Sequence, residues 1–420
     1  MKLAELAKEL NLPIKTSGLE EMEIYYQIRD YFFQLFALRI KNQFQSPSLK
    51  SSTTIQRTKN QNSIEHSVYQ RSDYNPLKAE NQLNDLYHAL KSKNPKTLYF
   101  NSGMAAINTL LFFLYHHHKI GLFLVGENAY YETKYLFEDY GSVSYYNDYY
   151  SLPKINFDSL WLEYPINCTN PANYPINKSS IIKIHLKQFF QQAKKNKKKK
   201  FYLVIDYTLG KVPFQQSVFK SAPENVSIFL VTSLQKHRGY GLDLVNAGAI
   251  TIFSNRKDYI YLKKLRAIMG ASYTQETFWL QPQISYKTIN KLIKDSGNIA
   301  YNISTQIINR KEVKCYFANN TFKTSFIFLK IDKKLITNHI KNPYLSDLLI
   351  KSIIKSAKIN KTEMITGTSF GFPFTRIFKN SERYENTDIL RIAIGYNEIL
   401  NSKTAKAINE GIEDFIKGLK

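Results

Sequence analysis

The chain has 420 residues and a mass of 48.9 kDa, which suits two or three domains and is too much for one small module. Hydrophobic residues make up 43% of the sequence and charged residues 22%, so the chain can bury a core and is not disordered throughout. The formal net charge is +24, and two cysteines are too few for a disulfide framework or a zinc site with four thiolate ligands.

The N-terminal part combines one helix with a polar segment. Apolar residues recur at helical spacing over residues 19–43, which predicts an amphipathic helix. Ser, Thr, Gln and Asn dominate residues 46–63, a composition that is typical of a linker or an arm and not of a core.

Export and membrane insertion are not expected for this chain. Residues 1–10 carry Glu5 and Glu9 and lack the apolar core of a signal peptide. The longest apolar stretch, residues 107–115, has half the length that is needed to cross a bilayer. We therefore expect a soluble cytoplasmic protein without a membrane partner.

From about residue 80, short apolar runs alternate with helix-like segments. Runs of this length with polar ends are typical of strands that are buried on both faces. Because helical lengths of chain separate the runs, we expect parallel crossovers and an open α/β sheet. The runs cover residues 122–126, 159–165, 201–206, 226–232 and 246–253.

Three consecutive histidines, His116, His117 and His118, stand at the end of a helical run. Consecutive residues on a helix do not share a face, so these three side chains cannot readily bind one ion. We interpret them as a helix terminus, where cations interact favourably with the helix dipole, and expect no metal site.

The densest basic run covers residues 194–200, between a predicted helix and a predicted strand. A net charge of +24 with a pI of about 9.6 is typical of nucleic-acid-binding proteins, but also of a chain whose whole surface favours lysine. No arginine-rich helix or recognisable nucleic-acid-binding module accompanies the run. We therefore interpret it as a solvated loop and do not expect nucleic acid as a partner.

After about residue 275 the pattern changes to that of a smaller α+β domain. Strand-like runs at residues 325–331 and 390–395 lie on either side of a predicted helix, and an amphipathic helix closes the chain. The expected domains are an N-terminal helix and arm (1–75), an α/β domain (76–275) and an α+β domain (276–420).

Four of the predicted strands end in residues that can carry chemistry. Ligands of open α/β proteins bind at the carboxyl ends of the strands, so polar residues there are candidates for a site. Small residues at 101–106 open a helix whose free N–H groups can hold a phosphate. Each segment by itself is equally typical of a helix cap or a solvated strand end. The other three are residues 163–167, Asp206 and residues 233–236.

Taken together and in chain order, these segments resemble the Cys/Met-metabolism family of pyridoxal-phosphate enzymes, such as cystathionine γ-synthase and γ-lyase. Each motif has moderate specificity, whereas the ordered set over residues 69–395 is strongly specific. The matching residues are Tyr69 and Arg71, residues 102–107 (SGMAAI), Tyr130 with Thr133, Leu136 and Phe137, Glu163 with Pro165 and Asn167, Asp206 with Thr208, Ser233 with Lys236, Gly239 and Asp243, and Arg391 with Gly395.

The resemblance implies an α/β fold, the aspartate-aminotransferase-like fold type I of pyridoxal-phosphate enzymes. A large cofactor domain on a mixed or parallel sheet would precede a smaller α+β C-terminal domain. Lys236 would hold the cofactor aldehyde as a Schiff base and then move protons. Asp206 would pair with the pyridine nitrogen and keep the ring positively charged, and Tyr130 would stack on the ring.

Further site residues follow from the same resemblance. Arg391 would bind the carboxylate of an amino-acid substrate, and Asn167 would lie near the cofactor hydroxyl and the substrate. Tyr69 and Arg71 would reach the phosphate of a neighbouring subunit, which implies a homodimer or homotetramer with shared active sites. The remaining expected cofactor-binding residues are Ser102, Gly103, Met104, Thr208 and Ser233, and Ser369 stands in the expected substrate loop.

Three segments depart from the family pattern. His237 and Arg238 follow the lysine where relatives have an aromatic residue and glycines; their bulk could depress the Schiff-base pKa, contact a substrate anion or point to solvent. Residues 281–288 lack the Arg-Gly-Leu of the family. Phe370 and Phe372 stand in the substrate loop, which predicts an altered side-chain pocket and leaves the substrate open.

We therefore predict a pyridoxal-phosphate-dependent lyase or transferase. It would catalyse β- or γ-elimination or replacement on a sulfur-containing or homoserine-derived amino acid. One alternative is a specialised biosynthetic enzyme with the same cofactor that uses a non-sulfur amino acid, or a transaminase. The other is a basic nucleic-acid-binding protein on an inactive enzyme scaffold, against which the presence of Lys236, Asp206 and Arg391 argues.

Overall fold

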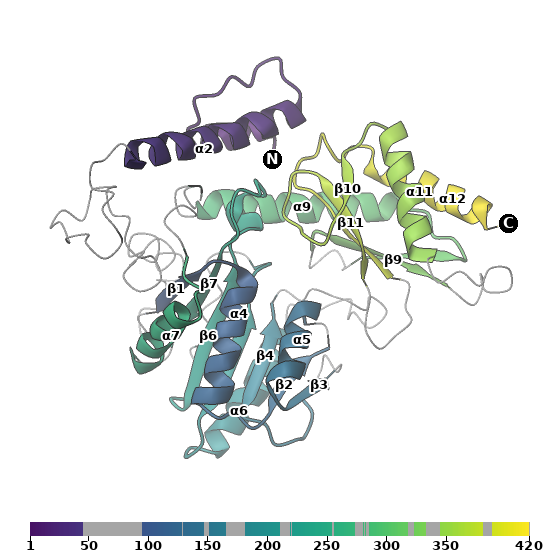
Figure 1. Ribbon diagram of the computed structural model, residues 1–420. Helices are drawn as coiled ribbons and strands as arrows, with labels where there is room; N and C mark the ends of the chain where they lie inside the picture. The colour runs from purple at the N-terminus through teal and green to yellow at the C-terminus, as the bar shows by residue number, and fades with distance from the viewer. Residues whose placement is uncertain are drawn as a thin grey trace.

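The structure, a computed structural model, contains a large and a small sheet with helices packed against both (Figure 1). The N-terminal helices lie at one side of the molecule, close to the helix that links the two sheets. The described residues are 1–44, 95–127, 129–146, 151–164, 181–210, 219, 221–253, 256–273, 280, 282, 285–317, 323–332, 345–380 and 389–419.

Seven strands form the large sheet in the order β1-β7-β6-β5-β4-β2-β3. Five of these strands, β3, β2, β4, β5 and β6, run parallel to one another, as expected for buried apolar runs that helical lengths of chain separate. The strands are β1 (Lys96–Phe100), β2 (Phe123–Gly126), β3 (Val143–Tyr146), β4 (Ser159–Glu163), β5 (Phe201–Asp206), β6 (Val226–Ser233) and β7 (Gly248–Ile252).

The direction of β7 differs from the prediction. The sequence predicts a strand at residues 246–253 in a parallel sheet, and the strand itself is confirmed. However, β7 runs antiparallel to both of its neighbours, β6 and β1. The physical reason is the connection: residues 234–247 contain only the short 3-10 helix η4 (His237–Gly239), whereas a parallel crossover needs a longer element that spans the sheet.

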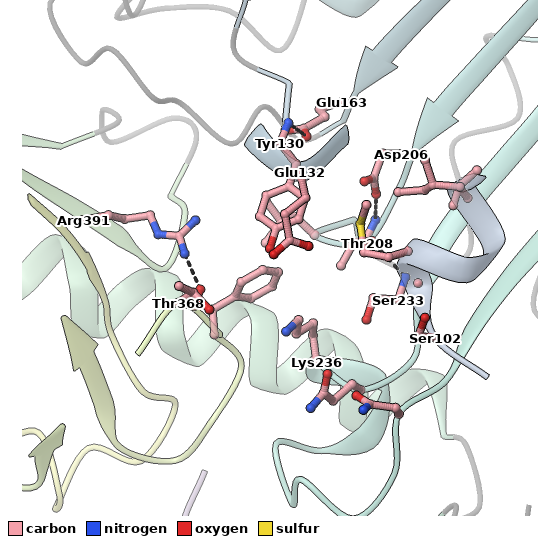
Figure 2. A pocket seen from close by; sticks show the side chains of 18 residues that line it. Ser102, Tyr130, Glu132, Glu163, Asp206, Thr208, Ser233, Lys236, Thr368 and Arg391 are labelled. Atoms are coloured by element: carbon pink, nitrogen blue, oxygen red, sulfur yellow. Dashed lines mark hydrogen bonds between the residues drawn. The ribbon is translucent and has the colours of Figure 1, made fainter. Parts of the chain in front are cut away.

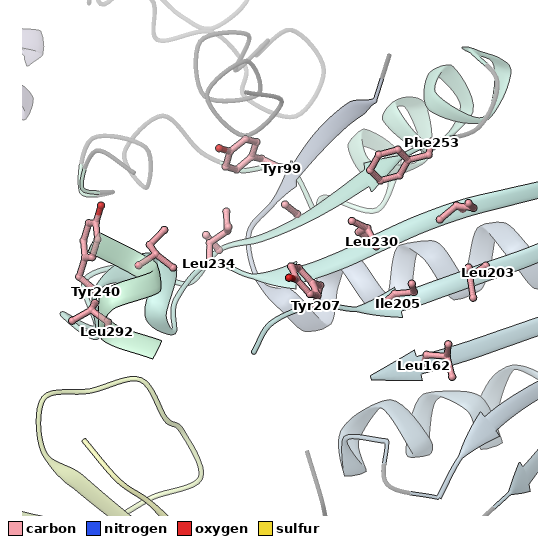
Figure 3. Close-up of a cluster of buried hydrophobic side chains, with 14 of the residues drawn as sticks. Tyr99, Leu162, Leu203, Ile205, Tyr207, Leu230, Leu234, Tyr240, Phe253 and Leu292 are labelled. Atoms are coloured by element: carbon pink, nitrogen blue, oxygen red, sulfur yellow. The ribbon is translucent and has the colours of Figure 1, made fainter. Parts of the chain in front are cut away.

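Each face of the large sheet carries its own apolar layer, because side chains alternate across a strand. On β5, Leu203 and Ile205 contribute to one cluster, whereas Tyr202 and Val204 contribute to the other. Figure 3 shows the first cluster around Leu203, Ile205, Tyr207 and Leu230. The helices of this part are α4 (Gly103–Phe112) with the π-helical turn η1 (Phe113–His117), α5 (Tyr131–Tyr140), α6 (Ile181–Lys195) and α7 (Arg256–Ile268).

The predicted helix terminus at the three histidines is confirmed. Helix α4 continues into η1, which ends at His117, and His118 caps it. The side chains make different contacts: the centres of the His117 and Tyr261 rings lie 3.8 Å apart, whereas His118 Nε2 lies 3.3 Å from Asp258 Oδ1.

A second, five-stranded sheet forms the core of the C-terminal part, in the order β10-β11-β12-β9-β8. The strands predicted at 325–331 and 390–395 are confirmed as neighbours in its centre, and the closing amphipathic helix is confirmed as well. The elements are α9 (Tyr286–Gln306), β8 (Val313–Phe317), β9 (Phe326–Ile331), α11 (Leu345–Ile359), β10 (Met364–Thr366), β11 (Thr375–Asn380), β12 (Ile389–Ala393) and α12 (Thr404–Gly418).

The predicted N-terminal helix is confirmed as α2 (Glu21–Phe44), which follows the short α1 (Leu3–Glu9). Contacts tie both helices to the rest of the molecule. The α-amino group of Met1 lies 2.6 Å from Asp295 Oδ2 on α9, and Tyr25 Oη donates a hydrogen bond of 3.2 Å to the carbonyl of Gly241. The polar segment 46–63 and the predicted domain boundaries at residues 75 and 275 lie outside the described residues.

None of the helices that the structure describes combines the length and the apolar composition needed to span a membrane.

Two glycines of α12 provide a test of the helix packing. A Cβ on Gly411 would lie 2.5 Å from Ile353 Cα of α11, whereas a Cβ on Gly418 would meet no atom within 4 Å. We predict that Gly411→Ala lowers the free energy of unfolding by about 1–3 kcal/mol, because α11 and α12 are forced apart. The control Gly418→Ala should change it by less than about 0.5 kcal/mol. Urea denaturation measures both, and equal effects of the two variants would contradict the close approach.

Candidate active site

A pocket of about 240 Å³ opens where several strand ends of the large sheet face the small sheet. Strands β4, β5 and β6 contribute their carboxyl ends, α4 and α5 their first turns, and the small sheet contributes β12 and the loop after β10 (Figure 2). The lining residues are Ser102, Gly103, Met104, Ile107, Tyr130, Glu132, Glu163, Asp206, Thr208, Leu209, Val231, Ser233, Gln235, Lys236, Asn246, Thr368, Phe370 and Arg391.

One end of the pocket is a cradle of hydroxyl groups and backbone N–H groups. Ser102 caps α4, and its Oγ accepts a hydrogen bond of 2.9 Å from the N–H of Ala105. The N–H of Ser233 donates to Thr208 Oγ1 at 2.9 Å, which ties two strand ends together. A Cβ on Gly103 would lie 3.2 Å from Ser233 Cβ, so the backbone here approaches closely. Such a helix start can bind a phosphate.

Asp206 lies at the end of β5, with its carboxylate directed toward the pocket. Its Oδ1 accepts a hydrogen bond of 3.0 Å from the N–H of Thr208. Burial raises the pKa of Asp206, and the hydrogen bonds of Thr208 and the nearby Arg238 guanidinium act in the opposite direction. A desolvated carboxylate of this kind is stabilised further when a cationic group of a ligand binds beside it.

Lys236 follows β6 and reaches into the pocket from the side opposite Asp206 (Figure 2). Its Nζ donates a hydrogen bond to Ser369 Oγ and lies 5.5 Å from the centre of the Phe370 ring. Burial and, to a lesser extent, the charge of Arg391 together lower the pKa of Lys236 to about 8. About a tenth of this amine is therefore uncharged at pH 7, far more than for a solvated lysine, and the uncharged form is the nucleophile.

Arg391 enters the pocket from β12 and is only 6% exposed. One guanidinium nitrogen donates to the carbonyl oxygen of Thr368, and Nε has no hydrogen-bond partner among the described residues. Burial lowers the pKa of Arg391, while Tyr130, Tyr131 and Glu163 act in the opposite direction. A buried guanidinium with an unused donor fits the binding of an anion such as a carboxylate.

Tyr130 precedes α5 and lines the pocket between Asp206 and Arg391 (Figure 2). Its backbone N–H donates to Glu163 Oε1 at the end of β4, which fixes the start of α5 against the sheet. Burial raises the pKa of the Tyr130 phenol above its usual range, so this side chain stays neutral at physiological pH.

The two sides of the pocket are joined by a close backbone contact. Gly241 and Gly371 both have positive φ angles, +65° and +85°. A Cβ on Gly241 would lie 2.1 Å from the Gly371 carbonyl oxygen, and one on Gly371 would lie 2.8 Å from the backbone nitrogen of His237. No residue larger than glycine fits at this crossing, which holds the segment after Lys236 against the loop that carries Phe370.

His237 and Arg238 are both buried, with exposed fractions of 1% and 0%, and neither points to solvent. Arg238 donates hydrogen bonds to the carbonyl oxygens of Thr208 at 2.9 Å and Tyr207 at 3.2 Å. Burial lowers the pKa of His237 to about 3, so the imidazole is neutral. Arg238 therefore supports the backbone beneath the pocket and does not bind a substrate anion there.

The structure brings together most of the residues that the sequence singles out. Ser369 bonds to Lys236 at the edge of the pocket. Tyr69, Arg71 and Asn167 lie outside the described residues, as do residues 281, 283 and 284 of the segment 281–288. The predicted residues that line the pocket are Ser102, Gly103, Met104, Tyr130, Asp206, Thr208, Ser233, Lys236 and Arg391.

Sequence reasoning missed Glu132, Gln235 and Asn246, which also line the pocket. Gln235 is fixed by a hydrogen bond of 2.7 Å from its Nε2 to Asp243 Oδ1. The signal for Glu132 was present, because it stands between Tyr130 and Thr133 of an already noted motif. Acidic residues are common in the first turn of a helix, because they interact favourably with the helix dipole. Such a residue is therefore not by itself a sign of a functional site.

No protein-family model matches the sequence, and no curated protein is significantly similar to it. Several solved structures match its fold. The metB protein of Corynebacterium glutamicum is 18% identical and matches with a TM-score of 0.60, over 88% of this chain and 92% of that one. Cystathionine gamma-lyase of Lactobacillus plantarum is 18% identical, with a TM-score of 0.58 over 87% and 93% of the two chains. Cystathionine gamma synthase of Xanthomonas oryzae pv. oryzae is 14% identical, with a TM-score of 0.54 over 79% and 86%.

This chain has the fold of these enzymes. The match covers more than three quarters of the chain in each of the three comparisons. The predicted fold class, fold type I with a large mixed sheet and a smaller α+β domain, is thereby confirmed.

The lowered pKa of Lys236 can be tested by chemical labelling of its amine. The labelling rate should rise with pH through a midpoint of about 8, because the amine is protonated and unreactive below that value. In Arg391→Gln the midpoint should move upward, since one of the charges that disfavour the ammonium form is gone. Mass spectrometry of the peptide that contains Lys236 measures both. A midpoint of about 10.4, as in model peptides, would contradict the burial of this side chain.

Proposed function

We propose that this protein is a pyridoxal-phosphate-dependent lyase or transferase that acts on an amino acid. The observation that carries the proposal is the placement of a lysine with a lowered pKa, a buried carboxylate and a buried guanidinium around one pocket. A cradle suited to phosphate lines the same pocket. Solved structures with this fold include cystathionine gamma-lyase and cystathionine gamma synthase, which supports the same reading.

The residues of the pocket fit pyridoxal phosphate on several counts. The N-terminus of α4 with the hydroxyls of Ser102 and Ser233 would hold its phosphate. Burial disfavours the charged form of Asp206, and its carboxylate would bind the protonated pyridine nitrogen, which stabilises that form. Lys236 would bind the aldehyde carbon through its amine, and Tyr130 would pack on the ring.

The bound cofactor supplies a sink for the electron pair that is left at Cα when a bond to that carbon breaks. The amine of Lys236 is suited to accept the Cα proton, because its pKa of about 8 lies close to physiological pH. Ser369, which accepts a hydrogen bond from Nζ, would hold this amine in position. The same amine can return the proton to the substrate carbon later in the reaction.

Arg391 would orient the substrate. Its unused Nε and a second guanidinium nitrogen can bind the two oxygens of an α-carboxylate. Because Thr368 and the strand β12 fix the guanidinium, the carboxylate position also fixes which bond at Cα faces the ring. The finer part of the proposal is β- or γ-elimination or replacement at a sulfur or oxygen substituent of the side chain.

The ligands of two similar structures agree with this chemistry. The Lactobacillus plantarum cystathionine gamma-lyase is complexed with L-serine, and the Xanthomonas oryzae pv. oryzae cystathionine gamma synthase with aminoacrylate and cysteine. Those proteins therefore bind small amino acids with a group on Cβ. We extend the class, an α-amino acid with a leaving group on its side chain, to this chain.

Shared active sites in a homodimer or homotetramer belong to the same proposal. It rests on the resemblance of Tyr69 and Arg71 to residues that reach the phosphate of a neighbouring subunit, and sedimentation of the purified protein tests it. The cytoplasmic location that the sequence suggests stays a prediction.

The cofactor can be tested by its visible spectrum. We predict an absorbance band at about 420 nm in the protein reconstituted with pyridoxal phosphate. Lys236→Ala should lose the band, because the amine that binds the aldehyde is absent. Asp206→Asn should lower turnover by roughly 10²-fold, since the partner of the ring nitrogen is no longer charged. The alternative is an inactive basic scaffold that binds nucleic acid. It would be supported if the protein lacks the band and retards nucleic acid in a gel with a steep dependence on salt.

The reaction can be tested by product analysis. Cystathionine, homoserine esters, methionine and cysteine are offered in turn to the reconstituted protein. Elimination should release ammonia with pyruvate from a β substituent or with 2-oxobutyrate from a γ substituent, and replacement should yield a thioether. If none of the four gives such a product while the absorbance band is present, a non-sulfur amino acid or transamination becomes the better assignment.

A further inference from the structure

Glu132 is a pocket residue whose role the proposed function leaves unexplained. It is the second residue of α5, is half-buried, and lines the pocket together with Lys236 and Arg391. Tyr131 Oη donates a hydrogen bond of 3.0 Å to Glu132 Oε1, which holds the side chain in place. Figure 2 shows the carboxylate directed into the pocket beside Tyr130 and facing Lys236.

The other two carboxylates that line the pocket are already engaged. Asp206 accepts a hydrogen bond from the N–H of Thr208 and would bind the cofactor ring. Glu163 accepts one from the N–H of Tyr130 and anchors the start of α5. Among the described lining residues, Glu132 is thus the carboxylate that neither the cofactor nor the backbone accounts for.

The charge of Glu132 acts inside the pocket. After burial it is the next cause that raises the pKa of Tyr130, and it also raises the pKa of Tyr131. It partly opposes the burial that lowers the pKa of Lys236. Because Glu132 lines the pocket, a ligand bound there is exposed to the same negative charge.

The two common groups of an amino-acid substrate already have partners in the proposed function. Arg391 would bind the α-carboxylate, and the cofactor would bind the α-amine. The substrate side chain would therefore contact the other residues that line the pocket. Besides Glu132, these residues contribute the apolar side chains of Leu209 and Phe370 and the uncharged amides of Gln235 and Asn246. A carboxylate in such surroundings attracts a cation and repels an anion.

We propose, resting on the function proposed above, that Glu132 selects an α-amino acid whose side chain ends in a protonated amine. The ammonium group would donate a charge-assisted hydrogen bond to the carboxylate that Tyr131 holds. A side chain that ends in a carboxylate is rejected by like-charge repulsion in the same space. Glu132 therefore determines specificity and does not take part in the proton transfers.

Three amino acids with side chains of similar length test the proposal. L-Ornithine ends in an ammonium group, L-norleucine in a methyl group and L-2-aminoadipate in a carboxylate, while all three share the same α groups. Titration calorimetry with the protein reconstituted with pyridoxal phosphate gives their dissociation constants at about pH 7. We expect ornithine to bind at least about tenfold more tightly than norleucine, and 2-aminoadipate to bind least tightly.

Variants of Glu132 test whether its charge determines which side chain binds. Glu132→Gln keeps the shape and should bring the ornithine and norleucine constants to within about twofold of each other, whereas Glu132→Lys should make 2-aminoadipate the tightest ligand. Asp139→Asn removes an exposed carboxylate from the last turn of the same helix and should leave the order unchanged. If Glu132→Lys fails to fold, Glu132→Gln alone decides.

The outcomes distinguish this inference from the proposed function. Equal binding of ornithine and norleucine to a protein that shows the absorbance band overturns the selection by Glu132 and leaves the cofactor assignment intact. The same holds if Glu132→Gln keeps the preference for ornithine, because another group would then bind the ammonium. A protein that takes up no pyridoxal phosphate overturns both.

Discussion

The pocket depends on the backbone crossing between Gly241 and Gly371. This contact holds the segment that follows Lys236 against the loop of the small sheet that carries Ser369 and Phe370. Without it, the strand ends of the large sheet would still present their polar residues, but Arg391 would have no fixed distance from them. Two tyrosines reinforce the crossing: Tyr25 donates to the carbonyl of Gly241, and Tyr396 donates to that of Tyr240.

Electrostatics in this pocket follow from burial more than from single ion pairs. Lysine and arginine side chains lie near each other with few charged partners, and desolvation is the largest cause of the lowered pKa of both Lys236 and Arg391. The carboxylate of Asp206 is destabilised in the same way. Desolvated charges of both signs in one site are stabilised when a ligand that carries both signs of charge binds there. A phosphorylated pyridinium and an amino acid are ligands of this kind.

Much of the fold was predictable because strand ends and helix starts leave local signals. The apolar runs that end at Asp206 and Ser233 have the length and the continuous apolar character of strands buried on both faces, and small residues after Phe100 open a helix. The direction of β7 was not predictable from periodicity, since an apolar strand has the same pattern in either orientation. The burial of Arg238 was equally hidden, because its partners are backbone carbonyls that the sequence does not identify.

The walls of the pocket come from residues as far apart in the chain as Ser102 and Arg391, and this separation has a consequence for how the molecule is made. During synthesis the N-terminal side emerges first, and domains generally fold as they appear. The hydroxyl cradle and Lys236 can therefore come together on a growing chain before β12 exists. Under the proposed function, the growing chain can therefore bind the cofactor before the residue that would bind the substrate carboxylate has been made.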